Sequence, residues 1–107
     1  MPVEKAVRER DVHMETLNID GREFRADEIP VMGQTKLLLI QGGCGMLGCG
    51  YVSLGAAEKF GHALAIVKGV ASYDDMLAAA VQEMSSAAAA LGVKTGMTGR
   101  EALVLMV

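Results

Sequence analysis

The sequence has few aromatic residues and no strong excess of charge of either sign. Its 107 residues include two tyrosines, two phenylalanines and no tryptophan, and the formal net charge is −3 at pH 7. Lysine and arginine are scattered along the chain. Nucleic-acid binding depends on basic stripes with stacking rings, so we expect no nucleic-acid partner.

Cysteine and histidine are also scarce, with two residues of each. Two cysteines do not make a disulfide framework of the kind found in small secreted domains, so we expect a reduced, cytoplasmic setting. Cys44 and Cys49 form a C-x4-C pair, but zinc sites commonly use four ligands, and neither His13 nor His62 lies at a paired spacing. A symmetric oligomer could pool ligands, but from one chain we expect no metal and no cofactor.

No charged residue lies between Lys36 and Glu58, a gap long enough for a membrane span. Residues 37–57 contain six glycines together with a glutamine and a serine, so we expect no membrane segment. Residues 1–11 are charged and lack an apolar core. We therefore expect a flexible lead-in over residues 1–11 rather than a signal peptide, and a single compact domain over residues 12–107.

Aliphatic residues are abundant, and 51% of the chain is hydrophobic. Soluble domains of this length bury only about 60–70% of the surface of the unfolded chain. The apolar surplus then faces solvent or another subunit, and large apolar patches are rarely left exposed to water. We expect self-association into a homo-oligomer.

The first part of the chain predicts strands. Apolar residues recur over residues 12–19, Asp20-Gly21 is a tight-turn signal, and residues 23–29 alternate as the second strand of a hairpin. Pro30 ends that strand or lies on an edge, and Gly33-Gln34 turns the chain again.

The middle of the chain predicts buried strands around a glycine-rich stretch. The apolar run Lys36–Ile40 is typical of a central strand covered on both faces. Residues 41–45 predict a turn, and residues 46–52 a strand in which glycine allows close approach of another segment. Residues 62–67 predict a further buried strand.

Helices are predicted by their caps. Ser53 caps a helix through Phe60 that Gly61 ends, Ser72 opens a second helix, and Thr98 with Glu101 forms a capping box. An apolar stripe from Leu77 to Leu91 favours one continuous helix, which Gly92 ends in a left-handed cap. We expect an α+β fold with a mixed or antiparallel sheet of about five strands covered by two to four helices.

Residues 43–48 fit the G-x-G-x-x-G pattern of dinucleotide-binding turns, but the context differs. Residues 49–52 continue as a strand instead of opening a helix, and Val67 is followed by Lys68 instead of an acid. A glycine turn with a closely packed strand is the favoured interpretation.

Cys49 is the candidate catalytic residue. Its flanking glycines leave the thiol open and bring backbone N–H groups near it, and an N–H cluster stabilises an oxyanion. His13 and His62 are the histidines that could act as a base. A small buried apolar role for Cys49 is the favoured interpretation, and catalysis the alternative. The candidate binding residues are Gly48, Gly50, Tyr51, Ser53 and Arg100.

The sequence is compatible with two functions. The first is a homo-oligomeric binding or assembly module. The second is a small-molecule enzyme or thiol-based sensor centred on Cys49, with a backbone anion hole and a small anionic ligand that Arg100 could neutralise.

Four segments resemble the YunC-like family of small bacterial and archaeal proteins: residues 49–53, 57–61, 65–70 and 91–103, the last being the most specific. The resemblance implies a single compact α+β domain, no established activity, and a recurrent candidate site at Cys49-Gly50. It also implies a helix that breaks near Ala80 and restarts near Ser85.

The chain departs from that family's pattern at three positions. Relatives usually carry Asn where Ser53 stands and Asp where His62 stands, and Cys44 has no usual counterpart.

Overall fold

The computed structural model describes residues 13–31 and 35–107. The expected lead-in over residues 1–11 and the turn at Gly33-Gln34 lie outside the described residues. Within the described part, the strands are β1 His13–Ile19, β2 Arg22–Val31, β3 Thr35–Gln41, β4 Met46–Gly48, β5 Leu64–Ile66 and β6 Glu83–Met84. The helices are α1 Leu54–Phe60, α2 Tyr73–Ala78, α3 Ser86–Ala90 and α4 Gly99–Leu105.

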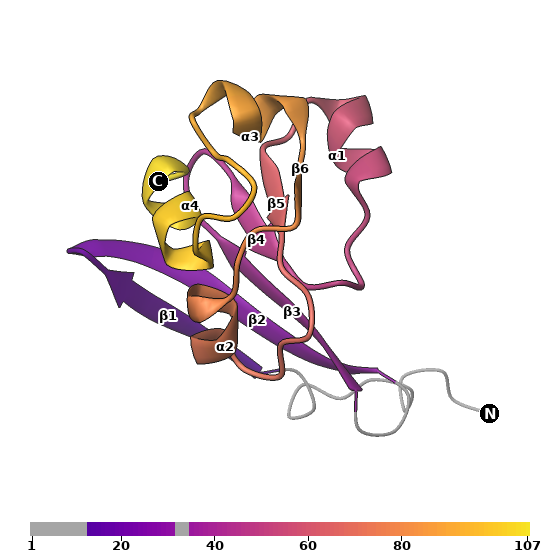
Figure 1. Cartoon of the computed structure of the whole chain (residues 1–107). Coiled ribbons are helices and arrows are strands. Elements are labelled where there is room, and N and C mark those ends of the chain that lie inside the picture. The colour runs from indigo at the N-terminus through magenta and orange to yellow at the C-terminus, as the bar shows by residue number, and fades with distance from the viewer. Residues whose placement is uncertain (1–12, 32–34) are drawn as a thin grey trace.

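The strands form one mixed sheet in the order β1-β2-β3-β4-β5-β6, so neighbours in sequence are neighbours in space (Figure 1). Every pair is antiparallel except β4 and β5, which run parallel because α1 connects them as a crossover. The predicted α+β class is confirmed. The sheet has one strand more than the five or so expected, because the short β6 adds to its edge.

The predicted hairpin is present. Asp20 and Gly21 adopt φ values of 53° and 82°, as a tight hairpin turn requires, and the Gly21 N–H donates to Asn18 Oδ1 at 3.2 Å. Strand β2 continues one residue beyond Pro30, which pairs with Lys36 of β3.

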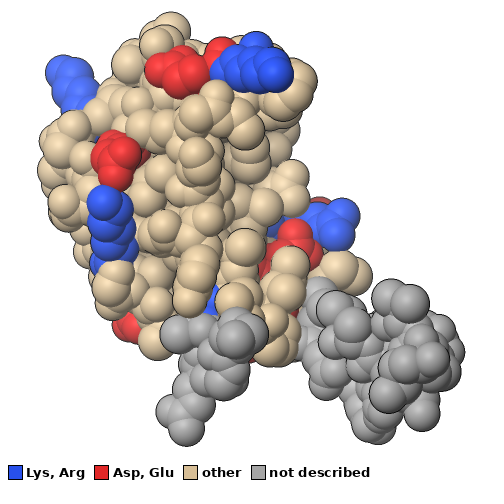
Figure 2. Space-filling view, turned by 90° about the vertical axis from the view of Figure 1, so that its right-hand side faces the viewer, with Lys and Arg blue, Asp and Glu red and all other residues tan. Residues whose placement is uncertain are grey.

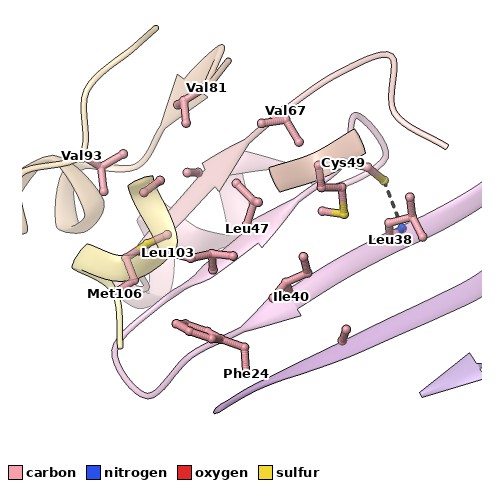
Figure 3. Packing of buried hydrophobic residues seen from close by; sticks show 14 of the residues in the cluster. Phe24, Leu38, Ile40, Leu47, Cys49, Val67, Val81, Val93, Leu103 and Met106 are labelled. Carbon is pink, nitrogen blue, oxygen red and sulfur yellow. Dashed lines mark hydrogen bonds between the residues drawn. The ribbon is translucent and has the colours of Figure 1, made fainter. Parts of the chain in front are cut away.

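The core lies on one face of the sheet, under α2 and α4. Leu38 and Ile40 of β3 are fully buried there together with Leu47 of β4 (Figure 3). The expectation that β3 is central is met, but full cover of both its faces is not, since Leu37 and Leu39 are only half-buried. Helix α1 covers part of the opposite face, where its Ala57 packs on the side chains of β5.

The single helix predicted between Leu77 and Leu91 is wrong. Helix α2 ends at Ala78, residues 79–85 are extended, and α3 starts only after Ser85, as the family resemblance implied. The cause is tertiary hydrogen bonding, because the Gln82 N–H donates to Ile66 O at 2.8 Å and extends the sheet. Ser85 Oγ then donates to His62 O at 2.7 Å while it accepts from Leu64 N at 2.9 Å.

The predicted caps are confirmed. Ser53 and Ser72 accept N–H groups of their own helices, and Gly61 ends α1 at φ 73°. Thr98 and Glu101 form the reciprocal capping box of α4. Gly92 adopts φ 101°. Among the described residues, no helix has the length and apolar content needed to cross a bilayer.

Candidate functional site

The parallel pair β4–β5 brings two loops to the same edge of the sheet. Because the two strands point the same way, the segments that follow them, residues 49–53 and 67–72, emerge at the same edge of the sheet. Ligands of open parallel sheets bind in the crevice outside the carboxyl ends of the strands. A pocket with a volume of about 520 Å³ lies at this edge.

Three segments line this pocket, which we call the carboxyl-end pocket. Lys36 comes from the start of β3, Cys49–Tyr51 follow β4, and Gly69–Ala71 follow β5. Small-molecule sites in proteins have volumes of about 300–1,000 Å³. The carboxyl-end pocket therefore has the size of a site for a small organic molecule.

The two loops offer backbone donors without internal acceptors. Among the described residues, the amide N–H groups of Gly50, Tyr51, Gly69 and Val70 make no hydrogen bond to another residue. The next amide, that of Ala71, donates to Asp75 Oδ2 at 3.0 Å. Gly50, Tyr51 and Gly69 are exposed and Val70 is half-buried, so water satisfies these N–H groups and a ligand can take its place.

Cys49 forms part of the pocket wall and is fixed to β3. Its N–H donates to Leu38 O at 3.1 Å, and its Sγ accepts the Leu38 N–H at 3.3 Å, the contact drawn in Figure 3. The residue is 4% exposed. Among the described residues that line this pocket there is no acid and no histidine.

Lys36 is the charged residue of the lining, and its ammonium pairs with Glu28 Oε2 at 3.3 Å. The Lys68 stem passes close to Gly50, with Cγ 3.7 Å from the position a Cβ would take there, and its ammonium pairs with Glu83 at 2.9 Å. Two ion pairs, Lys36 with Glu28 and Lys68 with Glu83, therefore lie around the pocket, and Lys36 is the member that lines it.

Glu28 also acts on Tyr73, on the neighbouring helix α2. Burial first, and then the negative charges of Glu28, Glu15 and Asp27, raise the pKa of Tyr73 to about 12. Its hydroxyl donates to His13 O at 3.4 Å.

The remaining predicted site residues lie elsewhere. Gly48 is the last residue of β4, where a Cβ would lie 2.8 Å from Val52 Cγ2, and Ser53 Oγ is occupied by the Gly55 N–H. Arg100 of α4 pairs at 2.6 Å with Asp20, which lies in the turn between β1 and β2. The structure thus brings together Cys49, Gly50 and Tyr51, and leaves the other three outside the lining.

Cys44 and His62 line a smaller hollow of about 300 Å³ at the opposite ends of β4 and β5. Cys44 is exposed, and neither cysteine forms a disulfide. In the described part of the chain, no three side chains of His, Cys, Asp or Glu gather as metal ligands.

Sequence reasoning missed Lys36 and residues 69–71 as pocket residues. The sequence holds a partial signal for these residues, because Gly69 comes shortly after the predicted buried strand 62–67. In the structure Gly69 adopts φ 72°. That this strand runs parallel to β4, and so delivers its loop beside Cys49, depends on the crossover through α1.

Comparison with known proteins extends over nearly the whole fold. The chain is 29% identical over 99 residues to the uncharacterized protein YunC of Bacillus subtilis (strain 168), a match that covers 89% of this chain and 97% of that protein. Its fold is similar to the crystal structure of a protein of unknown function from Thermoplasma acidophilum, with a TM-score of 0.84 and 29% identity over 90% of this chain and 93% of the other.

The family model described as a domain of unknown function, DUF1805, matches residues 48–106. This range includes both loops of the carboxyl-end pocket, but not Lys36. The chain therefore belongs to the DUF1805 family, and its predicted membership of the YunC-like proteins is confirmed.

Proposed function

We propose that this protein is a small-molecule binding module that works as a homo-oligomer, with the carboxyl-end pocket as its binding site. The observation that carries the proposal is the position of this pocket, a hollow of about 520 Å³ outside the ends of the one parallel strand pair of the described sheet. Two loops supply its walls and its unpaired amide donors.

Binding is favoured over catalysis by what lines the pocket. Acid–base or nucleophilic catalysis needs a base within hydrogen-bond reach of the group it activates. The lining residues that the structure describes include a lysine and a cysteine, but no carboxylate and no imidazole. Orientation of a ligand by amide donors needs neither.

A substitution that fills the pocket tests the proposal. Ala71 is exposed and lines the pocket, so Ala71→Trp occupies the space without disturbing the core. Ala90→Trp, at the exposed end of α3, is the matched control. Saturation-transfer NMR with a fragment library should find ligands that bind the wild type and the control but not Ala71→Trp. Fragments that bind all three proteins equally would place binding elsewhere.

Self-association is supported by apolar side chains left on the surface. Phe60 is 66% exposed, Met14 58% and Tyr51 54%, and Leu91, Val104 and Leu105 are exposed as well. Figure 2 shows charged side chains as separate groups with wide uncharged surface between them on one face. Where exposed apolar side chains form a large patch, a partner normally covers it. The two free cysteines fit the cytoplasmic setting that we propose.

A thiol-based activity at Cys49 is the second candidate. It is supported by the place of Cys49 in the pocket wall and by the backbone N–H that its sulfur accepts. This candidate requires that Cys49 reacts in the folded protein faster than an ordinary thiol.

A further inference from the structure

We propose that the carboxyl-end pocket selects a small molecule with one anionic group, a carboxylate or a phosphate, on a compact apolar body, and that Glu28 competes with this anion for Lys36. The inference rests on the proposed binding function and names the class of its ligand. The pocket's donors, its charge and its walls each support it.

The two loops supply hydrogen-bond donors to the pocket. Four amide N–H groups from two loops, those of Gly50, Tyr51, Gly69 and Val70, belong to lining residues and are unpaired within the described chain. Successive backbone N–H groups that point at one position form anion-binding sites in many proteins, and the proposed ligand uses the four donors of these loops in that way. A ligand with several acceptor oxygens on one centre satisfies more of these donors than a single carbonyl does.

The residues that line the pocket favour a ligand with negative charge. Among the described residues that line the pocket, Lys36 is the cation, and none is an Asp or a Glu. Lys68, whose stem runs beside Gly50, adds a second positive charge nearby. Among the described lining residues a cation would find no carboxylate, and the nearby Glu28 carboxylate is already paired with Lys36. An anion gains a charge-assisted hydrogen bond from Lys36.

The rest of the wall fits an apolar body. Val70 and Ala71 contribute aliphatic surface, Cys49 a buried sulfur and Tyr51 a half-exposed ring. Pockets for small molecules combine walls of this kind with a few placed polar groups that fix orientation. An inorganic anion alone would leave these walls uncovered.

Glu28 limits how strongly Lys36 can attract an anion. Its carboxylate lies 3.3 Å from the Lys36 ammonium, so a bound anion has to share that ammonium with Glu28. Both side chains are partly exposed, and substitutions there leave the core intact. Removal of the Glu28 charge should therefore strengthen anion binding, and removal of the Lys36 charge should weaken it.

Calorimetry with three probes of similar shape tests this inference. Phenyl phosphate and benzoate carry the anion, and benzamide is the neutral counterpart. At low ionic strength, where charge is least screened, we expect Lys36→Met to weaken phenyl phosphate and benzoate binding by about tenfold, the effect of a lost charge-assisted hydrogen bond. Glu28→Gln should tighten both by severalfold. Benzamide should bind more weakly than benzoate and respond to neither variant.

Equal binding of benzamide and benzoate, or unchanged anion affinity in Lys36→Met, would overturn the anion class while leaving the pocket as a binding site. If none of the three probes binds, the inference also fails. The proposed function then stands or falls separately, on whether Ala71→Trp loses the fragments that wild type binds. Lys36→Gln provides a second neutral variant should Lys36→Met fold poorly.

Discussion

At the scale of the residue, Cys49 is both part of the pocket wall and fixed to β3 by hydrogen bonds. Its sulfur and its N–H both bond to Leu38, which extends the pairing of β3 and β4 by one residue. The flanking glycines could be read from the sequence as a site for backbone contacts. The partner strand could not, because the register that joins residue 38 to residue 49 is set by tertiary pairing.

The rates of alkylation should distinguish the two cysteines. We expect iodoacetamide to modify the exposed Cys44 at about the rate of a model thiol, and Cys49 many times more slowly, because Cys49 is 4% exposed and hydrogen-bonded. Peptide mass spectrometry of the wild type and of Cys44→Ser measures both rates. If Cys49 were modified first in the folded protein, the thiol-based candidate would replace the binding proposal.

The titration of Tyr73 predicts a loss of stability in alkali. Its pKa is raised from 10.0 to about 12 by burial and then by Glu28, so the folded state holds the proton more tightly than the unfolded state does. The stabilisation is complete below the unfolded value and is lost as pH rises through the folded value. Urea unfolding should show a fall in the free energy of unfolding between pH 10 and 12 that is smaller in Tyr73→Phe. An identical fall in both proteins would contradict the assignment.

At the scale of the element, local signals were predictable and tertiary ones were not. Caps at Ser53 and Thr98 are read correctly because a cap depends on a few adjacent residues. The stripe from Leu77 to Leu91 has helical spacing, yet its middle is extended, since Val81 is buried in the core while Gln82 bonds to β5. A hydrogen bond to a strand residue sixteen positions earlier in the chain leaves no trace in the periodicity.

The contact between α4 and α2 depends on a glycine. A Cβ at Gly99 would collide with the Met76 carbonyl oxygen and lie 2.7 Å from Leu47 Cδ2. Gly99→Ala should therefore destabilise the fold by about 1–3 kcal/mol, the usual range for overpacking. Urea denaturation measures this change.

Gly55→Ala in α1 is the control for that change. Its nearest neighbour would be Ser53 Oγ at 3.4 Å, so the substitution should be neutral or stabilise by less than about 1 kcal/mol. A Gly99→Ala protein as stable as Gly55→Ala would show that α4 can move away from α2.

At the scale of the whole molecule, the fold class was predictable from the sequence, whereas the position of the carboxyl-end pocket depends on how the strands pair. The α+β class and a central β3 followed from the pattern of apolar runs. The parallel pairing of β4 and β5 did not, because three-residue strands carry too little pattern to fix their direction. That pairing brings residues 69–71 beside Cys49, so half of the pocket could not be placed in advance.

Light scattering after size-exclusion chromatography tests the assembly. We expect a mass above the 11.2 kDa of one chain at micromolar concentration. Phe60→Asp and Val104→Asp, both at exposed positions on different helices, should differ in effect, since a charge at the interface lowers the mass and a charge elsewhere does not. A monomer at every concentration would remove self-association from the proposal.

The central claim is that ligands bind outside the carboxyl ends of β4 and β5, and amide NMR tests it most directly. On titration with phenyl phosphate, the largest shifts should fall on Gly50, Tyr51, Gly69 and Val70, whose N–H groups are unpaired in the described structure. Shifts concentrated instead on residues 42–46, at the other end of the strands, would contradict the account.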